Sequence, residues 1–557
     1  MSYGPRAQRK AKRAPLWPLL FAVMLVVAAV VAAPSFMYEE KPPLSRPRLV
    51  YRGGRQFYPV VVEANEAYVP FAFVKDVIDP DAFAEDGMVI VTTKDKVVKL
   101  KTDSLTAYVN QHPVELQLPI TLEGDEPYIP ASALELLYPV TAILTDEAGT
   151  FIVRRTDAES TVATSVSDAV VRVEPSILSR RIAVLPPGRE VELFETKGGW
   201  VNVQTRDGIA GWMPKGRLSE PTRKPAEVVP ADDYVPAALS GDRVSLVWEQ
   251  VDWRTPDTSS IGPMSGLNVV SPTWFRLGET PGEVENYADP RYVSWAHSRG
   301  YKVWALFSNS FELQRTRTVL RDSDLRDKVI SQILVYAKMY SLDGINLDFE
   351  NVYQDDAPYL TQFVRELTPL LHEMGLTVSM DVTVKSKSPT WSLCYERSRL
   401  AEVLDYMMLM AYDQYAAGSK VAGPNSALTW VDSIIRLTLE EIPAEKLVLG
   451  MPFYMRLWKE SRTGEGVKVS QQAIGMRYAQ EWLREQGVTP VFDEETGLQY
   501  AEKSVGQDTW KLWVEDAASI AKRLELAESY GLAGVAAWRR GFETPEVWDA
   551  FASYTGR

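Results

Sequence analysis

The C-terminal part of the chain alternates short apolar runs with amphipathic helical stretches. Eight runs have the length and composition of buried strands: Ser245–Val251, Leu267–Ser271, Lys302–Phe307, Gly344–Phe349, Thr377–Val382, Tyr406–Met410, Leu447–Met451 and Gly534–Ala537. Apolar residues at helical spacing fill most of the gaps between them. Eight alternations predict a closed parallel (β/α)8 TIM barrel over residues 243–557, with its chemistry at the carboxyl ends of the strands. Residues 458–517, between the last two runs, predict a small insertion.

The pattern before the barrel is β-rich and interrupted by turns. In residues 48–157, Tyr68-Val69-Pro70 begins an apolar helical stretch, and Tyr128-Ile129-Pro130 does the same 60 residues later. This repeat predicts a duplicated α+β unit. Residues 162–218 alternate short strands with glycine turns and predict a second, all-β module. Four prolines indicate that residues 219–242 form a linker.

The first residues have a pattern of their own. Residues 1–14 carry five Arg and Lys side chains and no acid, and residues 15–37 then contain no charge in 23 positions. This order predicts a transmembrane anchor with a cytoplasmic N-terminus and an extracytoplasmic barrel. A cleaved signal peptide is the alternative, because the run ends in small residues. Residues 38–47 contain three prolines and predict a stiff spacer.

Composition narrows the function. Acidic residues outnumber basic ones by 74 to 60, which argues against nucleic acid as the main partner. The single cysteine, Cys394, excludes an intrachain disulfide framework. The three histidines have no metal-ligand spacing, so we expect neither a metal nor a cofactor.

The fourth predicted strand ends in a polar motif, Asp343-Gly-Ile-Asn346-Leu-Asp348-Phe-Glu350. Alternate side chains of a strand share a face, so Asn346, Asp348 and Glu350 should point into the barrel. Buried polar groups are costly unless they are used. Asp348, ~7 Å from Glu350 along the strand, should raise the pKa of Glu350 toward that of a general acid. The alternative is structural, since carboxylates at a strand end also cap helices and satisfy loop amides.

This motif resembles the DxxDxDxE signature of family 18 glycoside hydrolases, the chitinases and their relatives. Met408-Leu-Met410-Ala-Tyr412-Asp413 resembles the sixth strand of the family, and Gly534-Val-Ala-Ala-Trp538 resembles the eighth. Segments around Trp274 and from Gly450 to Arg456 resemble the branch that cuts bacterial and spore peptidoglycan. Asn346 is a departure, because the family usually has an aspartate at this position.

The resemblance implies a retaining mechanism in which the substrate's own acetamido group is the nucleophile. It implies that Glu350 is the acid and base, that Asp348 orients the acetamido group, and that Tyr412 hydrogen-bonds its carbonyl. Six more residues at strand ends are expected to bind substrate, together with Asn346: Asp413, Trp538, Trp274, Asp381, Tyr454 and Arg456. For Tyr412 and Trp538, plain filling of the barrel interior is the alternative.

The smaller modules also resemble known domains. Residues 48–157 resemble the stalk domain named after copper amine oxidases, although without metal-ligand spacing we expect no copper. Residues 162–218 resemble bacterial SH3-like wall-targeting domains, although a fold alone does not give a ligand. Together these features predict an N-acetylglucosaminidase that acts on peptidoglycan. The alternatives are a chitinase or chitooligosaccharide hydrolase, and a surface protein that binds glycan with little or no turnover.

Overall fold

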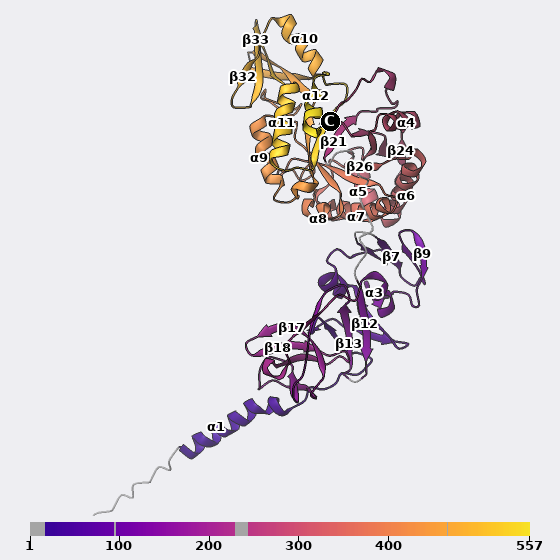
Figure 1. Cartoon of the computed structure of the whole chain (residues 1–557), viewed down its shortest axis with the longest axis vertical. Helices are drawn as coiled ribbons and strands as arrows, with labels where there is room; N and C mark the ends of the chain where they lie inside the picture. Colours follow the sequence, from indigo (N-terminus) through magenta and orange to yellow (C-terminus); the bar gives the residue numbers. More distant parts are fainter. Residues whose placement is uncertain (1–16, 94–95, 147, 229–242, 465, 557) are drawn as a thin grey trace, which may run out of the picture. The chain divides into compact units, whose positions relative to one another are not determined.

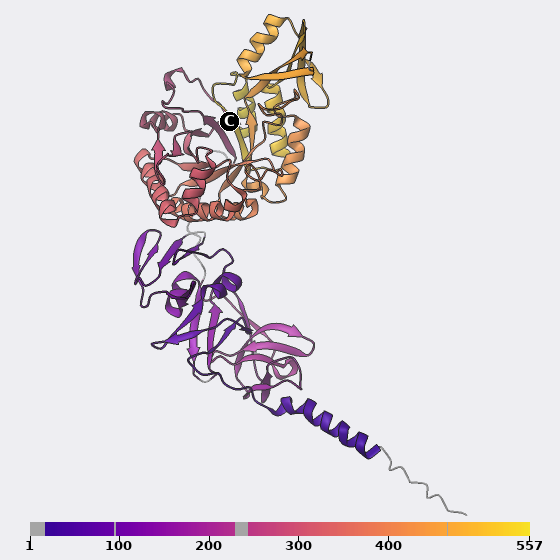
Figure 2. The ribbon, with the colours of Figure 1, turned by 180° about the vertical axis from the view of Figure 1, so that it is seen from behind.

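The computed structural model describes residues 17–93, 96–146, 148–228, 243–464 and 466–556. The chain divides into two compact units, one formed by residues 1–91 and 98–231, and the other by residues 92–97 and 232–557 (Figures 1 and 2). The first unit contains the stalk-like and SH3-like modules, and the second contains the barrel.

The first described element is helix α1 (Trp17–Ala32), which has 16 residues. At 1.5 Å per residue it is about 24 Å long, whereas the hydrocarbon core of a bilayer is about 30 Å thick. Among the residues that the structure describes, no helix is both long and apolar enough to cross a membrane. The transmembrane anchor predicted over residues 15–37 is therefore not confirmed, and the basic tail, residues 1–14, lies outside the described residues.

The stalk-like module has three sheets around one apolar core. Its strands are β1 (Arg48–Tyr51), β2 (Gly54–Gln56), β3 (Val61–Glu63), β4 (Glu66–Pro70), β5 (Phe83–Glu85), β6 (Met88–Thr92), β7 (Val97–Lys101), β8 (Thr106–Val109), β9 (His112–Glu115), β10 (Thr121–Glu123), β11 (Glu126–Pro130), β12 (Val140–Thr145) and β13 (Thr150–Arg155). Its helices are α2 (Phe71–Phe73), continued by a π-helical turn at Val74–Ile78, and α3 (Ala131–Leu137).

The sequence repeat becomes a pair of equivalent halves in this module. Strands β4 and β11 pair antiparallel with Val69 opposite Ile129, so the two repeated segments cross at the centre of one sheet. In each half, a glutamate carboxylate accepts a backbone N–H from the first turn of the helix in the other half. The Glu126 carboxylate accepts the backbone N–H of Ala72 at 2.7 Å, and the Glu66 carboxylate accepts that of Ser132 at 2.8 Å.

Because each glutamate caps only the helix of the other half, substitution of one glutamate serves as the control for substitution of the other. The substitution E126A should remove the protection of the Ala72 amide against hydrogen exchange and leave Ser132 protected, and E66A should do the reverse. Loss of such a cap destabilises a helix start by about 1 kcal/mol. Exchange measured by mass spectrometry on both variants checks this, and equal loss at both amides would contradict independent caps.

The SH3-like module is a sheet in the order β16-β15-β19-β18-β17-β14-β20 around a small apolar core. The strands are β14 (Ser160–Thr164), β15 (Ala169–Arg172), β16 (Arg181–Leu185), β17 (Glu190–Lys197), β18 (Trp200–Gln204), β19 (Ala210–Pro214) and β20 (Thr222–Lys224). Strand β20 pairs with β14, with Arg223 opposite Thr161. The predicted linker, residues 219–242, therefore begins as part of this sheet, and residues 229–242 lie outside the described residues.

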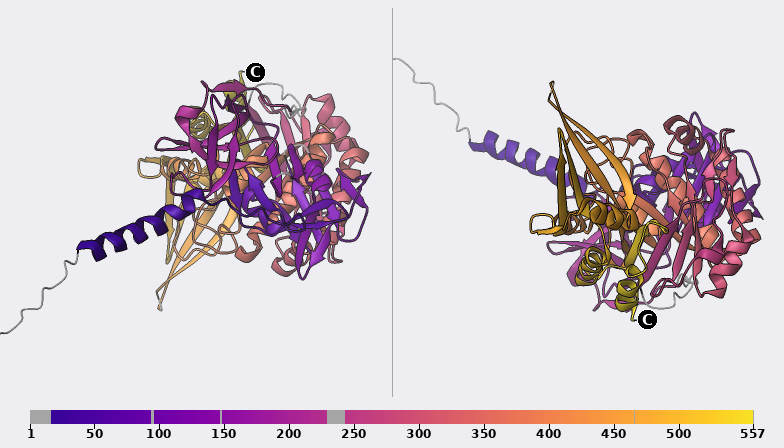
Figure 3. Two further views of the ribbon diagram at one scale, coloured as in Figure 1. Left: turned by 90° about the horizontal axis from the view of Figure 1, so that it is seen from below. Right: turned by 90° about the horizontal axis from the view of Figure 1, so that it is seen from above.

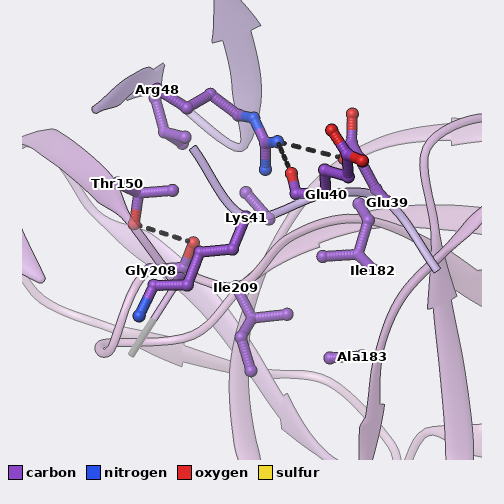
Figure 4. A pocket seen from close by; sticks show the side chains of 12 residues that line it. Glu39, Glu40, Lys41, Arg48, Thr150, Ile182, Ala183, Gly208 and Ile209 are labelled. Atoms are coloured by element: carbon purple, nitrogen blue, oxygen red, sulfur yellow. Dashed lines mark hydrogen bonds and ion pairs between the residues drawn. The ribbon is translucent and has the colours of Figure 1, made fainter. Parts of the chain in front are cut away.

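Residues 38–47 are also more ordered than a free spacer. Tyr38 bridges to Arg181 of the SH3-like module, and the Glu39 carboxylate pairs with Arg55 at 2.6 Å and Arg48 at 3.4 Å. This segment closes one side of a pocket of about 230 Å³ that Arg48, Thr150 and Ile182 also line (Figure 4). The prolines predict a stiff spacer, but they do not reveal that this segment packs against both modules.

The barrel has the eight parallel strands that the apolar runs predict. They are β21 (Val244–Glu249), β22 (Val269–Pro272), β25 (Lys302–Ser308), β26 (Gly344–Asp348), β27 (Thr377–Thr383), β28 (Tyr406–Met410), β29 (Leu447–Pro452) and β35 (Gly534–Trp538). Pairing of β22 with β25 closes the ring. A hairpin of β23 (Phe275–Leu277) and β24 (Val284–Asn286) extends the sheet beside β25.

The helices that connect these strands are α4 (Pro290–Ser298), α5 (Leu313–Leu320), α6 (Ser323–Tyr340), α7 (Ala357–Glu373), α8 (Arg397–Val403), α9 (Leu428–Thr438) and α11 (Ala517–Ser529), and α12 (Val547–Thr555) follows the last strand. Inside the ring, side chains from alternate positions form a separate core that includes Leu246, Leu306, Met408 and Ala536. The barrel is thus a filled core, and its chemistry must lie at an end of the ring.

The insertion lies between β29 and β35 and extends from the barrel (Figures 1 and 3). It is a five-stranded antiparallel sheet in the order β31-β30-β34-β33-β32, and it carries helix α10 (Met476–Gln486). The strands are β30 (Tyr454–Thr463), β31 (Gly466–Gly475), β32 (Val491–Asp493), β33 (Leu498–Val505) and β34 (Asp508–Val514). The insertion therefore begins near residue 454, earlier than the expected 458.

Three polar side chains fix the strand register at the amino end of the barrel. Asn268, Asp343 and Asp405 each precede a strand, and each accepts the backbone N–H of a residue in the neighbouring strand at 2.7–2.9 Å. Asp343 also pairs with Lys302 at 2.9 Å. The first acid of the polar motif is therefore a structural residue, at the end of the barrel opposite to Glu350.

Candidate active site

The polar motif on β26 faces the barrel interior as predicted. Strand β26 pairs in parallel with β25, with Asn346 opposite Leu306 and Asp348 opposite Ser308. Because Leu306 belongs to the interior core, Asn346 and Asp348 share that inward face. Asn346 is fully buried and accepts a hydrogen bond from the Ser379 hydroxyl at 3.3 Å.

Glu350 lies just beyond the carboxyl end of β26, and a neighbouring strand fixes its backbone. The Glu350 N–H donates to Oδ1 of Asn309 at 3.1 Å, and Nδ2 of Asn309 donates to the Glu350 carbonyl at 2.7 Å. Asn309 is fully buried directly after β25. It is a positioning residue that sequence reasoning missed, and its place immediately after the third strand is the only signal that could have found it.

Asp381 joins this group from β27. The register of β26 and β27 places Asn346 opposite Ser379 and Leu347 opposite Met380, so Asp348 and Asp381 stand at the same level. Neighbouring strands lie about 4.8 Å apart. Asp348 is 8% exposed and Asp381 is 2% exposed. Within the described part of the chain, Oδ1 of each has no hydrogen-bond partner.

Crowding and burial keep these carboxyls protonated to higher pH than usual. Burial raises the pKa of Asp348 from 3.8 to about 7. Burial, followed by the charges of Asp348 and Asp413, raises the pKa of Glu350 well above its ordinary 4.5. The raised pKa favours the protonated form of Glu350, which is the form that a general acid needs.

A second cluster of polar and aromatic side chains lies just after the end of β28 and at the start of β30. Asp413 has a left-handed backbone, with φ of 58°, and its Oδ1 accepts hydrogen bonds from the Tyr454 hydroxyl at 2.6 Å and from Arg456 at 2.5 Å. The Tyr412 ring packs edge-on against Tyr454, with 6.2 Å between the ring centroids. Burial raises the pKa of Tyr412 well above 10, and the nearby charge of Asp381 adds to the rise. Tyr412 therefore links the two clusters.

Asn425 holds this second cluster and was also missed by sequence reasoning. It is buried, its Oδ1 accepts the Asp413 N–H at 3.2 Å, and its Nδ2 donates to the Tyr454 carbonyl at 3.0 Å. It lies in the loop after β28, where nothing in the sequence distinguishes it from other loop asparagines.

The two predicted tryptophans differ in accessibility. Trp538, at the carboxyl end of β35, is partly exposed and packs against Trp248 with 6.2 Å between ring centroids. Trp274 is fully buried, donates its indole N–H to Thr255 at 3.2 Å and packs edge-on against Tyr292. A sugar needs an open ring face, so the structure leaves Trp274 a packing role instead of the predicted substrate contact.

No group of three or more His, Cys, Asp and Glu side chains in the described ranges could hold a metal ion. The two clusters and Trp538 together offer proton donors, carboxylates and an aromatic face, a set suited to acid-catalysed cleavage of a polar substrate.

The raised pKa of Asp348 predicts a pH-dependent gain in stability on its removal. Its folded pKa of about 7 lies above the ordinary 3.8, so ionisation of Asp348 destabilises the fold at pH 8, and this penalty shrinks as the pH falls from 7 toward 3.8. The effect is at most about 4 kcal/mol. D348N should therefore melt several degrees higher than wild type at pH 8. The gap should narrow at pH 5, as calorimetry at both pH values would show. An equal gap at both would contradict this origin.

Three segments match known family models. Residues 283–543 match the glycosyl hydrolases family 18, residues 167–219 match the bacterial SH3 domain, and residues 55–151 match the copper amine oxidase N-terminal domain. The first match begins after the second barrel strand, so it covers the barrel from β25 onward and includes all of the carboxyl cluster.

Known proteins resemble the same region. The uncharacterized glycosylase YvbX of Bacillus subtilis (strain 168) is 23% identical over 321 residues, which are 55% of this chain and 91% of that protein. The cortical fragment-lytic enzyme of the same organism is 24% identical over 250 residues, and the chain spans only 57% of its length. The spore cortex-lytic enzyme SleL of Bacillus megaterium QM B1551 aligns with a TM-score of 0.50 and 18% identity over 66% of this chain and 89% of that one, which shows a shared fold.

Proposed function

Given that residues 283–543 are a family 18 glycoside hydrolase domain, we propose that the chain hydrolyses β-1,4-linked glycans that contain N-acetylglucosamine, with retention of configuration. The observation that carries the proposal is Glu350. It is a carboxyl with a raised pKa at the carboxyl end of a barrel strand, and Asp348 lies one inward position before it. Family 18 is an exception to the rule of two catalytic carboxylates, because the acetamido group of the substrate is the nucleophile.

The chemistry assigns one role to each catalytic residue. Glu350 protonates the leaving glycosidic oxygen and then takes a proton from the water that completes hydrolysis. Asp348 orients the acetamido N–H and stabilises the positive charge of the oxazolinium intermediate. The Tyr412 hydroxyl donates to the acetamido carbonyl oxygen. The three side chains come from the carboxyl ends of β26 and β28, between which only β27 lies, so we assign them to one sugar.

The second cluster would hold the rest of the sugar. Tyr454 and Arg456 both contact Oδ1 of Asp413, so Oδ2 is the oxygen that we assign to a sugar hydroxyl. Trp538 would stack beneath the apolar face of the ring. Because Tyr454 and Arg456 already hold the Asp413 carboxylate, it loses little conformational freedom when substrate binds.

Bacterial peptidoglycan is the substrate that we favour over chitin. The bacterial SH3 match over residues 167–219 supports a cell-wall partner. The name of the cortical fragment-lytic enzyme of B. subtilis and that of the spore cortex-lytic enzyme of B. megaterium also support a wall glycan. This substrate would place the barrel outside the cytoplasmic membrane.

Product analysis tests the proposal. Wild-type protein is incubated separately with purified peptidoglycan and with chitooligosaccharides, and the new reducing ends are identified by mass spectrometry. We expect N-acetylglucosamine at the reducing ends released from peptidoglycan. Faster release from chitooligosaccharides would identify a chitinase instead, and binding without release would identify a glycan-binding protein.

A further inference from the structure

Two buried acids face each other across neighbouring strands in the site. The register of β26 and β27 continues from Leu347 opposite Met380 to Asp348 opposite Asp381, so the two acids occupy the same level of the inward face on strands whose backbones lie about 4.8 Å apart. Each has one carboxylate oxygen, Oδ1, that is buried and finds no partner among the described residues. Two carboxylates in this position cannot both be ionised near neutral pH, because their repulsion is little screened when water is excluded.

The groups around the pair provide little positive charge to relieve this repulsion. Glu350, just beyond the end of β26, adds to the negative charge that raises the pKa of Asp381, and the neutral Tyr412 lies close by at the end of β28. The Asn346 side chain lies close enough to Asp381 to offset part of the rise in its pKa. Arg456, from β30, is engaged by Asp413 and by Gln471 at 3.0 Å. A proton held between the two acids would satisfy both orphaned oxygens and remove one of the two charges.

We propose that Asp381 is a positioning residue that shares a single proton with Asp348, so that the pair carries one negative charge in the substrate-free enzyme. The proton moves along one O–H···O hydrogen bond between the carboxyls and does not leave the pair, so the total charge stays at −1. When Asp381 holds the proton, Asp348 is the ionised partner. This inference rests on the proposed function, in which an ionised Asp348 faces a positive intermediate, but the shared proton itself exists without substrate.

Infrared titration tests the shared proton without any turnover. The measurement uses the E350Q background and subtracts the spectrum of the E350Q/D348N/D381N protein, so that neither Glu350 nor other buried acids such as Glu515 contribute to the carboxylic-acid band that is followed. If the proton is shared, D381N and D348N should each lower the pH midpoint at which the remaining acid band disappears, by about one pH unit or more. An unchanged midpoint in either variant would overturn the proposal, because the protonated acid would then owe its proton to burial alone.

Kinetics of three variants separates proton sharing from shape. D381N keeps the size of the side chain but cannot share a proton, whereas D381E keeps the carboxyl but is one methylene longer. We expect kcat to fall about tenfold in D381N with little change in KM, and D381E to retain the higher kcat. A higher kcat in D381N than in D381E would overturn the proposal and indicate a packing role.

Asp405 provides the matched control, since it is an acid at the amino end of the same barrel, where it pairs with His372 at 3.1 Å. D405N should change the melting temperature without moving the infrared midpoint or the pH profile of kcat. If D381E does not fold, the infrared titration of D381N and D348N still decides. If wild type releases no sugar, the proposed function is wrong. The infrared titration still tests the shared proton, because it needs no turnover.

Discussion

The substitution E350Q should reduce kcat on peptidoglycan by about a thousandfold and leave the fold intact. A positioned general acid typically contributes a factor of about 10²–10⁴ to a rate. Burial and the charges of Asp348 and Asp413 raise the pKa of Glu350, which favours the protonated form, and glutamine cannot donate such a proton. Glutamine fills the same space, so KM and the melting temperature should change little. Release of reducing ends under substrate saturation measures the effect.

Glu481 is the control for this experiment. It lies exposed on α10, outside both clusters of the site, so E481Q should match wild type in kcat and stability. If E350Q and wild type released equal amounts of product, Glu350 would not be the acid. If E350Q lost activity together with its cooperative melting transition, the loss would reflect unfolding instead of chemistry.

The eight strands could be predicted because parallel barrel strands are buried on both faces and are therefore almost continuously apolar. Tyr406–Met410 was predicted with both of its ends correct. Within such a run, polar residues at alternate positions are conspicuous, and this is how Asn346 and Asp348 were found. Local pattern is sufficient for these features because they depend on one strand and its environment.

The remaining features depend on partners that are distant in sequence. Asn309 fixes Glu350 across 41 residues, and Arg456 reaches Asp413 across 43. Trp274 was expected to face sugar because it follows a strand, but the loop that contains Thr255 covers it. A side chain's final direction is set by the packing of several loops together, which no local pattern contains.

The structure differs from the predicted boundary between the SH3-like module and the linker for a similar reason. Proline-rich segments were interpreted as linkers, yet Thr222–Lys224 adds a strand to the SH3-like sheet. Residues that follow a proline can still donate to an edge strand, because only the proline itself lacks the N–H. Composition therefore predicts an extended backbone but not whether a neighbouring strand pairs with it.

The buried pair of Arg523 and Glu515 connects the stability of the barrel to its site. Both side chains are fully buried, and two hydrogen bonds of 2.8 Å and 2.9 Å join them. Arg523 also donates to the carbonyl of Ser426, whose hydroxyl donates to the Ala411 carbonyl at 2.6 Å, directly before Tyr412. Helix α11 therefore supports the strand end that presents the second cluster.

R523M should lower the free energy of unfolding of the barrel by about 3–5 kcal/mol, because it leaves a carboxylate buried without its partner. Burial already raises the pKa of Glu515 to about 7, so the unpaired acid should take up a proton, and the loss should be smaller at pH 5 than at pH 8. Denaturant unfolding at both pH values measures the difference.

Two variants sharpen the interpretation of R523M. Adding E515Q removes the stranded charge and should restore part of the stability at pH 8. R436M breaks an exposed ion pair with Asp432 on α9 and should change the stability by less than about 1 kcal/mol. If R523M destabilised no more than R436M, the buried pair would not hold the loop. If stability were lost while kcat of the remaining folded protein stayed unchanged, the pair would support the barrel without positioning Tyr412.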